Sequence, residues 1–399
     1  MKPLFTRKIL NNGMIVLHEK RDIPVTTIAL ATKIGYGFEH AKIKGISHFI
    51  EHMAFKGTEK RTAEQISSEL EKVGGELNAF TSDEITVFHV KLPSRHLKLG
   101  VDVLSDIFFN PLMKKEELEK ERKVIIEEIK MYHDDPKRYV LDRIKELSYK
   151  APFGLHGIGS VETLSNMKQE HLLEFHKKNY VASNTILCIV GNNSFNEIIE
   201  LIKKIPVKKG KIKNNIVVKR VSEKVTEKRN NIQQSNIVIS IPAPTLVDKK
   251  RYSAQLFAAI LGEGLSSRLF REIREKRGLA YAVKAYLDAG INFGTIDFYV
   301  GTEKGKEEIV KNLILEEIQK MTNLSEKELI DAKQQLIGSY EVEEEDSRNT
   351  ALKFIMEELC GDASHYYDFE HKIKAVKLND VKEFSKIKDY SYVALVPED

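Results

Sequence analysis

A related order of strand and helix patterns occurs twice along the chain, and this internal duplication limits the possible folds more than any other feature. In each half, strand and helix patterns lead to a final pair of helices, the second of which is highly charged. The charged helices, expected at 116–131 and 326–341, align with Leu118 opposite Leu329, Glu121 opposite Ala332, and Glu128 opposite Ser339. The halves therefore share a scaffold, but only the first keeps these carboxylates.

Both halves mix alternating apolar stretches with longer segments of helical spacing, so we expect an α+β fold. Each half is expected to form an α/β sandwich domain, a mostly antiparallel sheet packed by helices. A lysine-rich stretch separates the halves. We place a linker at 210–219, between an N-terminal domain at 1–209 and a C-terminal domain at 220–399.

Local signals place the elements of the first half. Helical spacing runs from Gly45 to Phe55, and Thr62 with Gln65 forms a capping-box sequence that begins a second helix. One strand is expected at 76–92, and a further helix follows it.

Composition and charge exclude several classes of protein. No apolar run is long enough to cross a membrane, and the start of the chain lacks a secretory signal, so we expect a cytoplasmic protein with no membrane partner. The net charge of +4 is spread over 63 basic and 59 acidic side chains, without the basic patch that nucleic acids require. Cys188 and Cys360 are expected to be reduced, with Cys188 in the core.

The first half carries two histidines on a segment with helical spacing. His48 and His52 are four residues apart, which places both rings on one face of a helix. Two imidazoles in this arrangement can bind one tetrahedral zinc ion, and Glu51 reaches the same side. Zinc lowers the pKa of a bound water molecule toward neutrality, and a neighbouring carboxylate can take the proton. The segment therefore predicts a zinc-dependent hydrolytic site.

A catalytic zinc ion normally has three protein ligands and one open position, so a further side chain is needed. The charged helix of the first half offers six glutamates. Glu121 and Glu128 lie two turns apart on nearly one face, whereas Glu127 is rotated by about 100° from Glu128. This spacing favours Glu128 as the ligand and Glu121 as the acceptor for a ligand histidine, but it leaves the choice among the glutamates open.

Five segments resemble the pitrilysin/insulinase family of metallopeptidases, in its branch similar to the mitochondrial processing peptidase. In chain order they are residues 45–58, 75–82, 121–128, 261–270 and 274–281. The resemblance covers essentially the whole chain, and it settles the choice among the glutamates. It implies that His48, His52 and Glu128 bind one zinc ion per chain, that Glu51 is the general base, and that Glu121 supports the site.

The same resemblance assigns residues to substrate binding. Asn78, Ala79 and Phe80 match the edge strand on which these enzymes hold an extended peptide through main-chain hydrogen bonds. Arg274 and Tyr281 match the pair with which the second half of the family grips the substrate and stabilises the oxyanion.

Members of the family build a closed chamber from four such domains, and this chain has two. The resemblance therefore implies half of a clamshell that dimerises, so that Arg274 and Tyr281 of one subunit complete the zinc site of the other. A homodimer is expected because neither set of residues is missing, and a heterodimer stays open. Lys137 and Arg138 stand where presequence-cleaving relatives have acidic residues, which argues against a preference for basic presequences.

The leading hypothesis is a zinc-dependent metalloendopeptidase that hydrolyses unfolded peptides or processes protein segments inside a dimeric chamber. A peptide-binding subunit with a vestigial site is a second hypothesis, and it would bind peptides but no metal. A zinc hydrolase of non-peptide amides is a third, and it would cleave only small amides.

Overall fold

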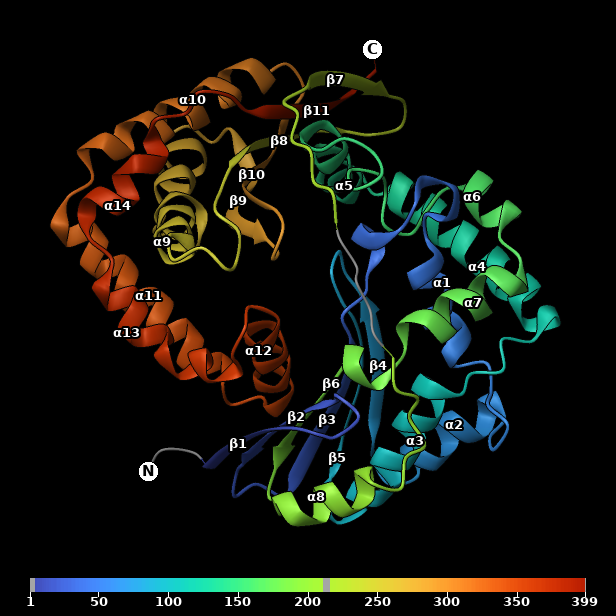
Figure 1. Cartoon of the computed structure of the whole chain (residues 1–399). Helices are drawn as coiled ribbons and strands as arrows, with labels where there is room; N and C mark the ends of the chain where they lie inside the picture. The colour runs from blue at the N-terminus through green and yellow to red at the C-terminus, as the bar shows by residue number, and fades with distance from the viewer. Residues whose placement is uncertain (1–3, 211–215, 399) are drawn as a thin grey trace. The chain divides into compact units, whose positions relative to one another are not determined.

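The computed structural model describes residues 4–210 and 216–398, which form two compact units (Figure 1). The first unit takes its described residues from Met1–Ile129, Gly157–Ile216 and Glu343–Tyr366. The second takes them from Lys130–His156, Val217–Val342 and Tyr367–Asp399. Each unit contains one mixed sheet and several helices, so the expected α+β class is confirmed.

The sheet of the first unit has the strand order β1-β2-β6-β3-β5-β4. Strands β2 and β6 are parallel, and the other neighbours are antiparallel. In sheet order, the strands are β1 (Leu4–Ile9), β2 (Ile15–Lys20), β6 (Thr185–Gly191), β3 (Val25–Thr32), β5 (Thr86–Pro93) and β4 (Glu76–Thr81). In the part of the chain that the structure describes, β4 therefore forms one edge of this sheet.

The single strand expected at 76–92 is wrong, because the segment forms the two strands β4 and β5. They are joined by a turn in which the Ser82 N–H donates to the Ile85 carbonyl at 2.8 Å. Ser82, Asp83 and Glu84 interrupt the apolar pattern, and serine and aspartate favour turns through local side-chain hydrogen bonds.

Several helices complete the first unit. They are α1 (Ile46–Ala54), α2 (Ala63–Glu71), α3 (Leu97–Phe109), the first part of α4 (Lys115–Asp134), α6 (Val161–Asn166), α7 (Gln169–Asn179), α8 (Phe195–Ile202) and α12 (Ser347–Leu359). Helix α2 begins with the predicted capping box, since Thr62 accepts from the Gln65 N–H at 3.2 Å and Gln65 accepts from the Thr62 N–H at 2.8 Å.

The sheet of the second unit has the order β7-β11-β8-β10-β9. Its strands are β7 (Lys224–Arg229), β11 (Ser391–Pro397), β8 (Gln234–Pro242), β10 (Gly294–Glu303) and β9 (Ala280–Ala289). Its helices are α5 (Pro136–Ser148), α9 (Arg251–Gly262), α10 (Glu307–Lys320), most of α11 (Glu326–Glu343), α13 (Phe369–Ala375) and α14 (Leu378–Lys382). One parallel pair followed by three antiparallel pairs repeats the pattern of β2-β6-β3-β5-β4, which supports the duplication.

Each unit also contains one helix from the other half of the sequence. Helix α5 packs on β8 and β11 of the second sheet, and α12 packs on β3 and β6 of the first (Figure 1). Half of the linker expected at 210–219 lies outside the described residues, and this domain boundary stays a prediction. Among the described helices, none is both long and apolar enough to cross a membrane.

Candidate metal centre

Helix α1 is held in place at its N-terminal end by a buried carboxylate. The N–H groups of Gly45 and Ser47 donate to Glu39 at 2.8 and 2.7 Å, which satisfies donors that a helix start leaves open. Burial raises the pKa of Glu39 to about 7. One face of the helix is anchored in the core by Ile46, Phe49, Ile50 and Met53. This packing fixes the direction in which His48 and His52 point.

Helix α4 brings the carboxylates to the histidines. Leu118 and Ile125 are buried in the core and set the orientation of the helix. Glu121 is only 6% exposed and lies on the same buried side, and Glu128 lies two turns further along. Glu127, which the spacing argument rotates away from the site, is exposed.

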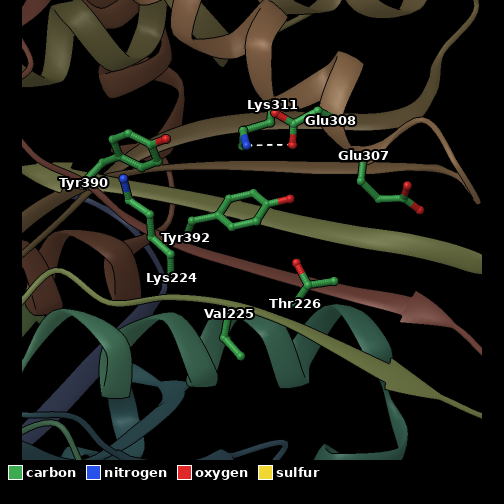
Figure 2. A pocket seen from close by; sticks show the side chains of 8 residues that line it. All are labelled: Lys224, Val225, Thr226, Glu307, Glu308, Lys311, Tyr390 and Tyr392. Carbon is green, nitrogen blue, oxygen red and sulfur yellow. Dashed lines mark hydrogen bonds and ion pairs between the residues drawn. The ribbon is translucent and has the colours of Figure 1, made fainter.

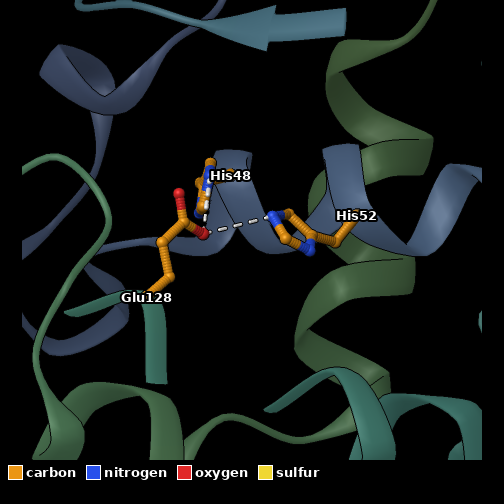
Figure 3. A group of neighbouring side chains, drawn as sticks. All are labelled: His48, His52 and Glu128. Atoms are coloured by element: carbon orange, nitrogen blue, oxygen red, sulfur yellow. Dashed lines mark ion pairs between the residues drawn. The ribbon is translucent and has the colours of Figure 1, made fainter. Parts of the chain in front are cut away.

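The three side chains that the sequence predicts as zinc ligands lie together (Figure 3). Glu128 Oε2 is 3.5 Å from His52 Nε2 and 3.8 Å from His48 Nε2, and the three donor atoms lie within 4.8 Å of one another. The donor atoms of a tetrahedral zinc site with two imidazoles and a carboxylate are about 3.3 Å apart. The residues therefore fit a zinc ion in both ligand type and spacing. In the described part of the chain, this is the one group with such a donor set.

Glu121 contacts the second ring nitrogen of His52. Its Oε2 lies 3.2 Å from His52 Nδ1, and its Oε1 forms an ion pair with Lys56 Nζ at 2.7 Å. A carboxylate on the second ring nitrogen fixes the orientation of a metal-binding imidazole. Lys56 balances the buried charge of Glu121, and the sequence analysis missed this role. The close spacing of Lys56 to His52 in the sequence was the available signal.

Glu51 projects from the same helix toward strand β4. Its Oε2 accepts a hydrogen bond of 2.5 Å from the Thr81 hydroxyl at the end of the strand. Burial raises the pKa of Glu51, and the hydrogen bond from Thr81 opposes this shift without cancelling it. The contact with Thr81 was also missed, because no local pattern links residues 30 positions apart.

Nearby carboxylates change the protonation of His52. Burial alone would lower the pKa of the ring, but hydrogen bonds with Glu128 and Glu121 outweigh burial and raise it. A metal ion binds only the neutral ring, so below the raised pKa of His52 metal binding at this site displaces a proton.

The residues predicted to bind substrate are divided between the two units of the chain. Asn78, Ala79 and Phe80 lie on the edge strand β4 of the first unit. Arg274 and Tyr281 lie in the second unit, where Arg274 donates to the Tyr281 carbonyl at 2.9 Å. Arg274 also lines a pocket of about 590 Å³ together with Leu265 and Phe270.

The Tyr281 side chain is 45% exposed and belongs to a small polar network. Its hydroxyl lies 3.5 Å from Asn236 Oδ1 and 3.4 Å from the Tyr299 hydroxyl. Tyr299 in turn donates to Asn236 at 2.8 Å. The ring of Tyr281 is thus held on the surface of the second sheet.

A further pocket of about 420 Å³ lies in the second unit between β7, α10 and the start of β11 (Figure 2). Its two lysines already have partners. Lys224 Nζ lies 3.7 Å from the centre of the Tyr390 ring, and Lys311 pairs with Glu308 at 2.6 Å. The charges of the pocket balance one another, and its lining resembles no catalytic arrangement.

Comparisons with known proteins identify the family of the chain. Residues 14–159 match the family model described as insulinase (peptidase family M16), and residues 166–336 match the M16 inactive domain. An uncharacterised zinc protease of Rickettsia felis is 35% identical over 84% of this chain and 83% of its own length. An uncharacterised zinc protease of Bacillus subtilis is 30% identical over 99% of this chain and 98% of its own length.

Solved structures show the same fold. A protease from Helicobacter pylori has a TM-score of 0.92 at 22% identity, covering 99% of this chain and 100% of that chain. An M16 inactive domain protein from Pseudomonas fluorescens has a TM-score of 0.89 at 18% identity, covering 99% and 98%. Taken with the relatives above, these matches show that the chain belongs to the insulinase (M16) family of peptidases and is a zinc metallopeptidase.

Proposed function

We propose that His48, His52 and Glu128 hold one zinc ion per chain, and that the protein is an endopeptidase for unfolded peptides. The observation that carries this proposal is the convergence of three donor atoms from two helices within 4.8 Å. Two imidazoles and one carboxylate leave a fourth position open, as hydrolytic zinc sites require. A zinc ion held there would polarise the scissile carbonyl and acidify a water molecule.

Glu51 is the general base in this proposal. It lies next to His52 in the sequence, and its raised pKa keeps it a better proton acceptor than an exposed glutamate. It takes a proton from the attacking water molecule and returns it to the leaving amine. Glu121 keeps His52 in the orientation that presents Nε2 to the ligand position, and Lys56 stabilises the charge of Glu121.

The test is a comparison of cleavage with metal content. Glu51→Gln preserves the size of the side chain but removes the base, so peptide cleavage should disappear while the zinc content stays at the wild-type value. Removal of zinc by a chelator should abolish cleavage, and zinc should restore it. Full cleavage by Glu51→Gln, or by the zinc-depleted protein, would refute the proposal.

Substrate binding on strand β4 is the second part of the proposal. Strand β4 pairs with β5 on one side, and an extended peptide could pair with its other edge through main-chain hydrogen bonds. Such binding demands little of the peptide sequence. Methylation of alternate peptide nitrogens should raise KM strongly when the methylated groups face β4. An unchanged KM for every methylated peptide would contradict this binding mode.

Arg274 and Tyr281 complete the site from a second subunit in this proposal, within a dimeric chamber. It is supported by the family resemblance, by their contact with each other, and by the pocket beside Arg274. A mixture of Glu51→Gln chains and Arg274→Ala chains tests it. If the groups act across subunits of a homodimer, the mixture regains about a quarter of wild-type activity, because half of the dimers carry one complete site. No recovery would argue against the dimeric arrangement. Membership of the processing-peptidase-like branch stays a prediction.

A further inference from the structure

Strand β4 links the two parts of the proposed mechanism. Its free edge is the proposed peptide-binding surface, and its last residue, Thr81, contacts the proposed base Glu51. A side chain in this place touches the base from the strand that would hold the substrate. Its role is therefore open to a specific test.

A hydrogen bond joins Thr81 to Glu51. The Thr81 hydroxyl donates to Glu51 Oε2 at 2.5 Å. Among the described residues, Thr81 is the one hydrogen-bond donor recorded for this carboxylate. A carboxylate has about four acceptor sites, so Glu51 can accept this bond and still take a proton from water.

A glutamate on a helix surface can rotate about three side-chain bonds, and ordering these bonds has an entropic cost. A donor fixed in the right place removes most of that freedom before the reaction begins. Preorganised groups of this kind account for much of enzymatic rate enhancement. Thr81 can restrict Glu51 in this way only if Thr81 is itself held in place.

The structure holds strand β4 at both ends. Thr81 pairs with Thr86 across the β4–β5 ladder, next to the turn. At the other end, Glu76 forms an ion pair of 2.5 Å with Arg348 on helix α12. Asp346, which precedes α12, pairs with Lys91 of β5 at 3.0 Å. Thr81 therefore projects from a strand that pairs with β5 along its length, and this ladder holds it in place.

We propose that Thr81 is a positioning residue that holds the Glu51 carboxylate in its reactive orientation and joins the peptide-binding strand to the base. The inference rests on the proposed function, because it takes Glu51 to be the base. Thr81 acts through Glu51 and touches neither the metal ligands nor the reacting atoms.

Thr81→Val removes the hydroxyl and keeps the size and branching of the side chain. The loss of a hydrogen bond to a charged group should lower kcat by about tenfold to a hundredfold, with KM within about twofold of the wild-type value. Zinc content and zinc affinity should be unchanged, since Thr81 does not contact the ligands. Thr81→Ser keeps the donor and should restore most of the lost kcat.

Thr86→Val is the matched control. Thr86 lies directly opposite Thr81 on β5, and its hydroxyl donates to the Ile34 carbonyl at 2.9 Å. This variant loses a buried hydrogen bond in the same hairpin and should keep the wild-type kcat. An equal loss of kcat in both threonine variants would overturn the proposal, since the effect would then be structural.

A double-mutant cycle tests whether Thr81 acts through the base. Glu51→Asp shortens the carboxylate so that it no longer reaches Thr81, and Thr81→Val should then lower kcat by less than about twofold further. A full additional loss would contradict the positioning role. Failure of the proposed function gives a different result, namely full cleavage by Glu51→Gln. Loss of cleavage in Glu51→Gln with normal kcat in Thr81→Val would reject only the role of Thr81.

Discussion

Helices α4 and α11 occupy corresponding places in the two units. They differ most at the positions where α4 carries the carboxylates of the candidate site. Leu118 in α4 and Leu329 in α11 are both buried, as their alignment requires. Glu121 is buried where α11 has the buried Ala332. A buried carboxylate is unfavourable unless it is paired, and Glu121 pairs with Lys56 and His52. The corresponding position of the second unit holds a small apolar residue, so the shared fold does not itself require a carboxylate there.

Helices α1 and α9 show the same contrast. Both pack against their own sheets, but α9 has small apolar side chains and no histidine in its sequence. Ala254, Ala258 and Ala259 are buried in α9. One copy of the duplicated scaffold therefore carries the proposed metal ligands and the other lacks them, which leads to the following predictions.

The largest effect is expected at Glu128 and its counterpart. Glu128→Gln removes a charged ligand, so zinc should be lost and kcat/KM should fall by more than about a thousandfold. Substitution of a residue that only orients a ligand typically costs about tenfold to a hundredfold. Ser339 holds the corresponding place in α11 and is exposed, so Ser339→Ala should leave both quantities unchanged. Metal analysis and peptide kinetics measure the pair. Equal effects of Glu128→Gln and Ser339→Ala on zinc content and kcat/KM would contradict the difference between the two helices.

Helices α12 and α5, which each pack on the sheet of the other half, provide the next comparison. Phe354 on α12 stacks against Phe5 and contacts Tyr366, with ring centres 4.8 and 4.5 Å away, and Phe354→Ala should destabilise the first unit by about 3–5 kcal/mol. Ile144 on α5 packs near Val238, and Ile144→Ala should destabilise the second unit by about 2–5 kcal/mol.

Hydrogen exchange shows which sheet each substitution affects. Phe354→Ala should increase exchange in β3 and β6, and Ile144→Ala in β8 and β11. The reverse assignment would contradict the packing of α12 and α5.

A smaller effect on zinc affinity is expected when Glu121 or its partner Lys56 is replaced. Glu121→Gln should weaken zinc binding by about tenfold to a hundredfold. Lys56→Met should weaken it less, because the carboxylate still contacts His52 at 3.2 Å but loses its counter-charge. Competition with a chromophoric chelator measures both. Zinc affinity that stays the same in Glu121→Gln would rule out this supporting role.

The smallest effect concerns pH. The pKa of His52 is raised by hydrogen bonds with Glu128 and Glu121, which outweigh burial, so its ring stays protonated to a higher pH than an ordinary histidine. Zinc requires the neutral ring, so zinc affinity should be highest above this pKa. It should fall by about tenfold per pH unit below it when one proton is displaced. In Glu121→Gln the fall should begin at a lower pH, because one cause of the raised pKa is gone. A pH-independent affinity would contradict this coupling.

Local sequence patterns predicted the elements that carry the site. The four-residue spacing of the histidines and the apolar face around them indicated α1, and Thr62 and Gln65 indicated the start of α2. Helix α4 was predicted as a long, highly charged helix that follows the amphipathic helix at 94–109. Spacing alone could not choose among the glutamates of this helix, since several share nearly one face, and the family resemblance was needed.

Contacts between distant segments could not be predicted in this way. The turn at Ser82 was missed because the apolar pattern continues on both sides of it. The placement of α5 and α12 on the sheets of the other halves depends on contacts far apart in sequence, which no local pattern encodes. The contacts of Lys56 with Glu121 and of Thr81 with Glu51 depend on the same long-range packing.

X-ray absorption spectroscopy of the zinc-loaded protein tests the central claim most directly. We predict one zinc ion per chain, bound by two imidazole nitrogens at about 2.0–2.1 Å and by carboxylate oxygen at about 2.0–2.2 Å, with no sulfur ligand. The imidazole signal should be lost in a His48→Ala, His52→Ala variant. A spectrum with fewer than two imidazoles, or one that is unchanged in Glu128→Gln, would contradict the assignment of these three side chains as the ligands.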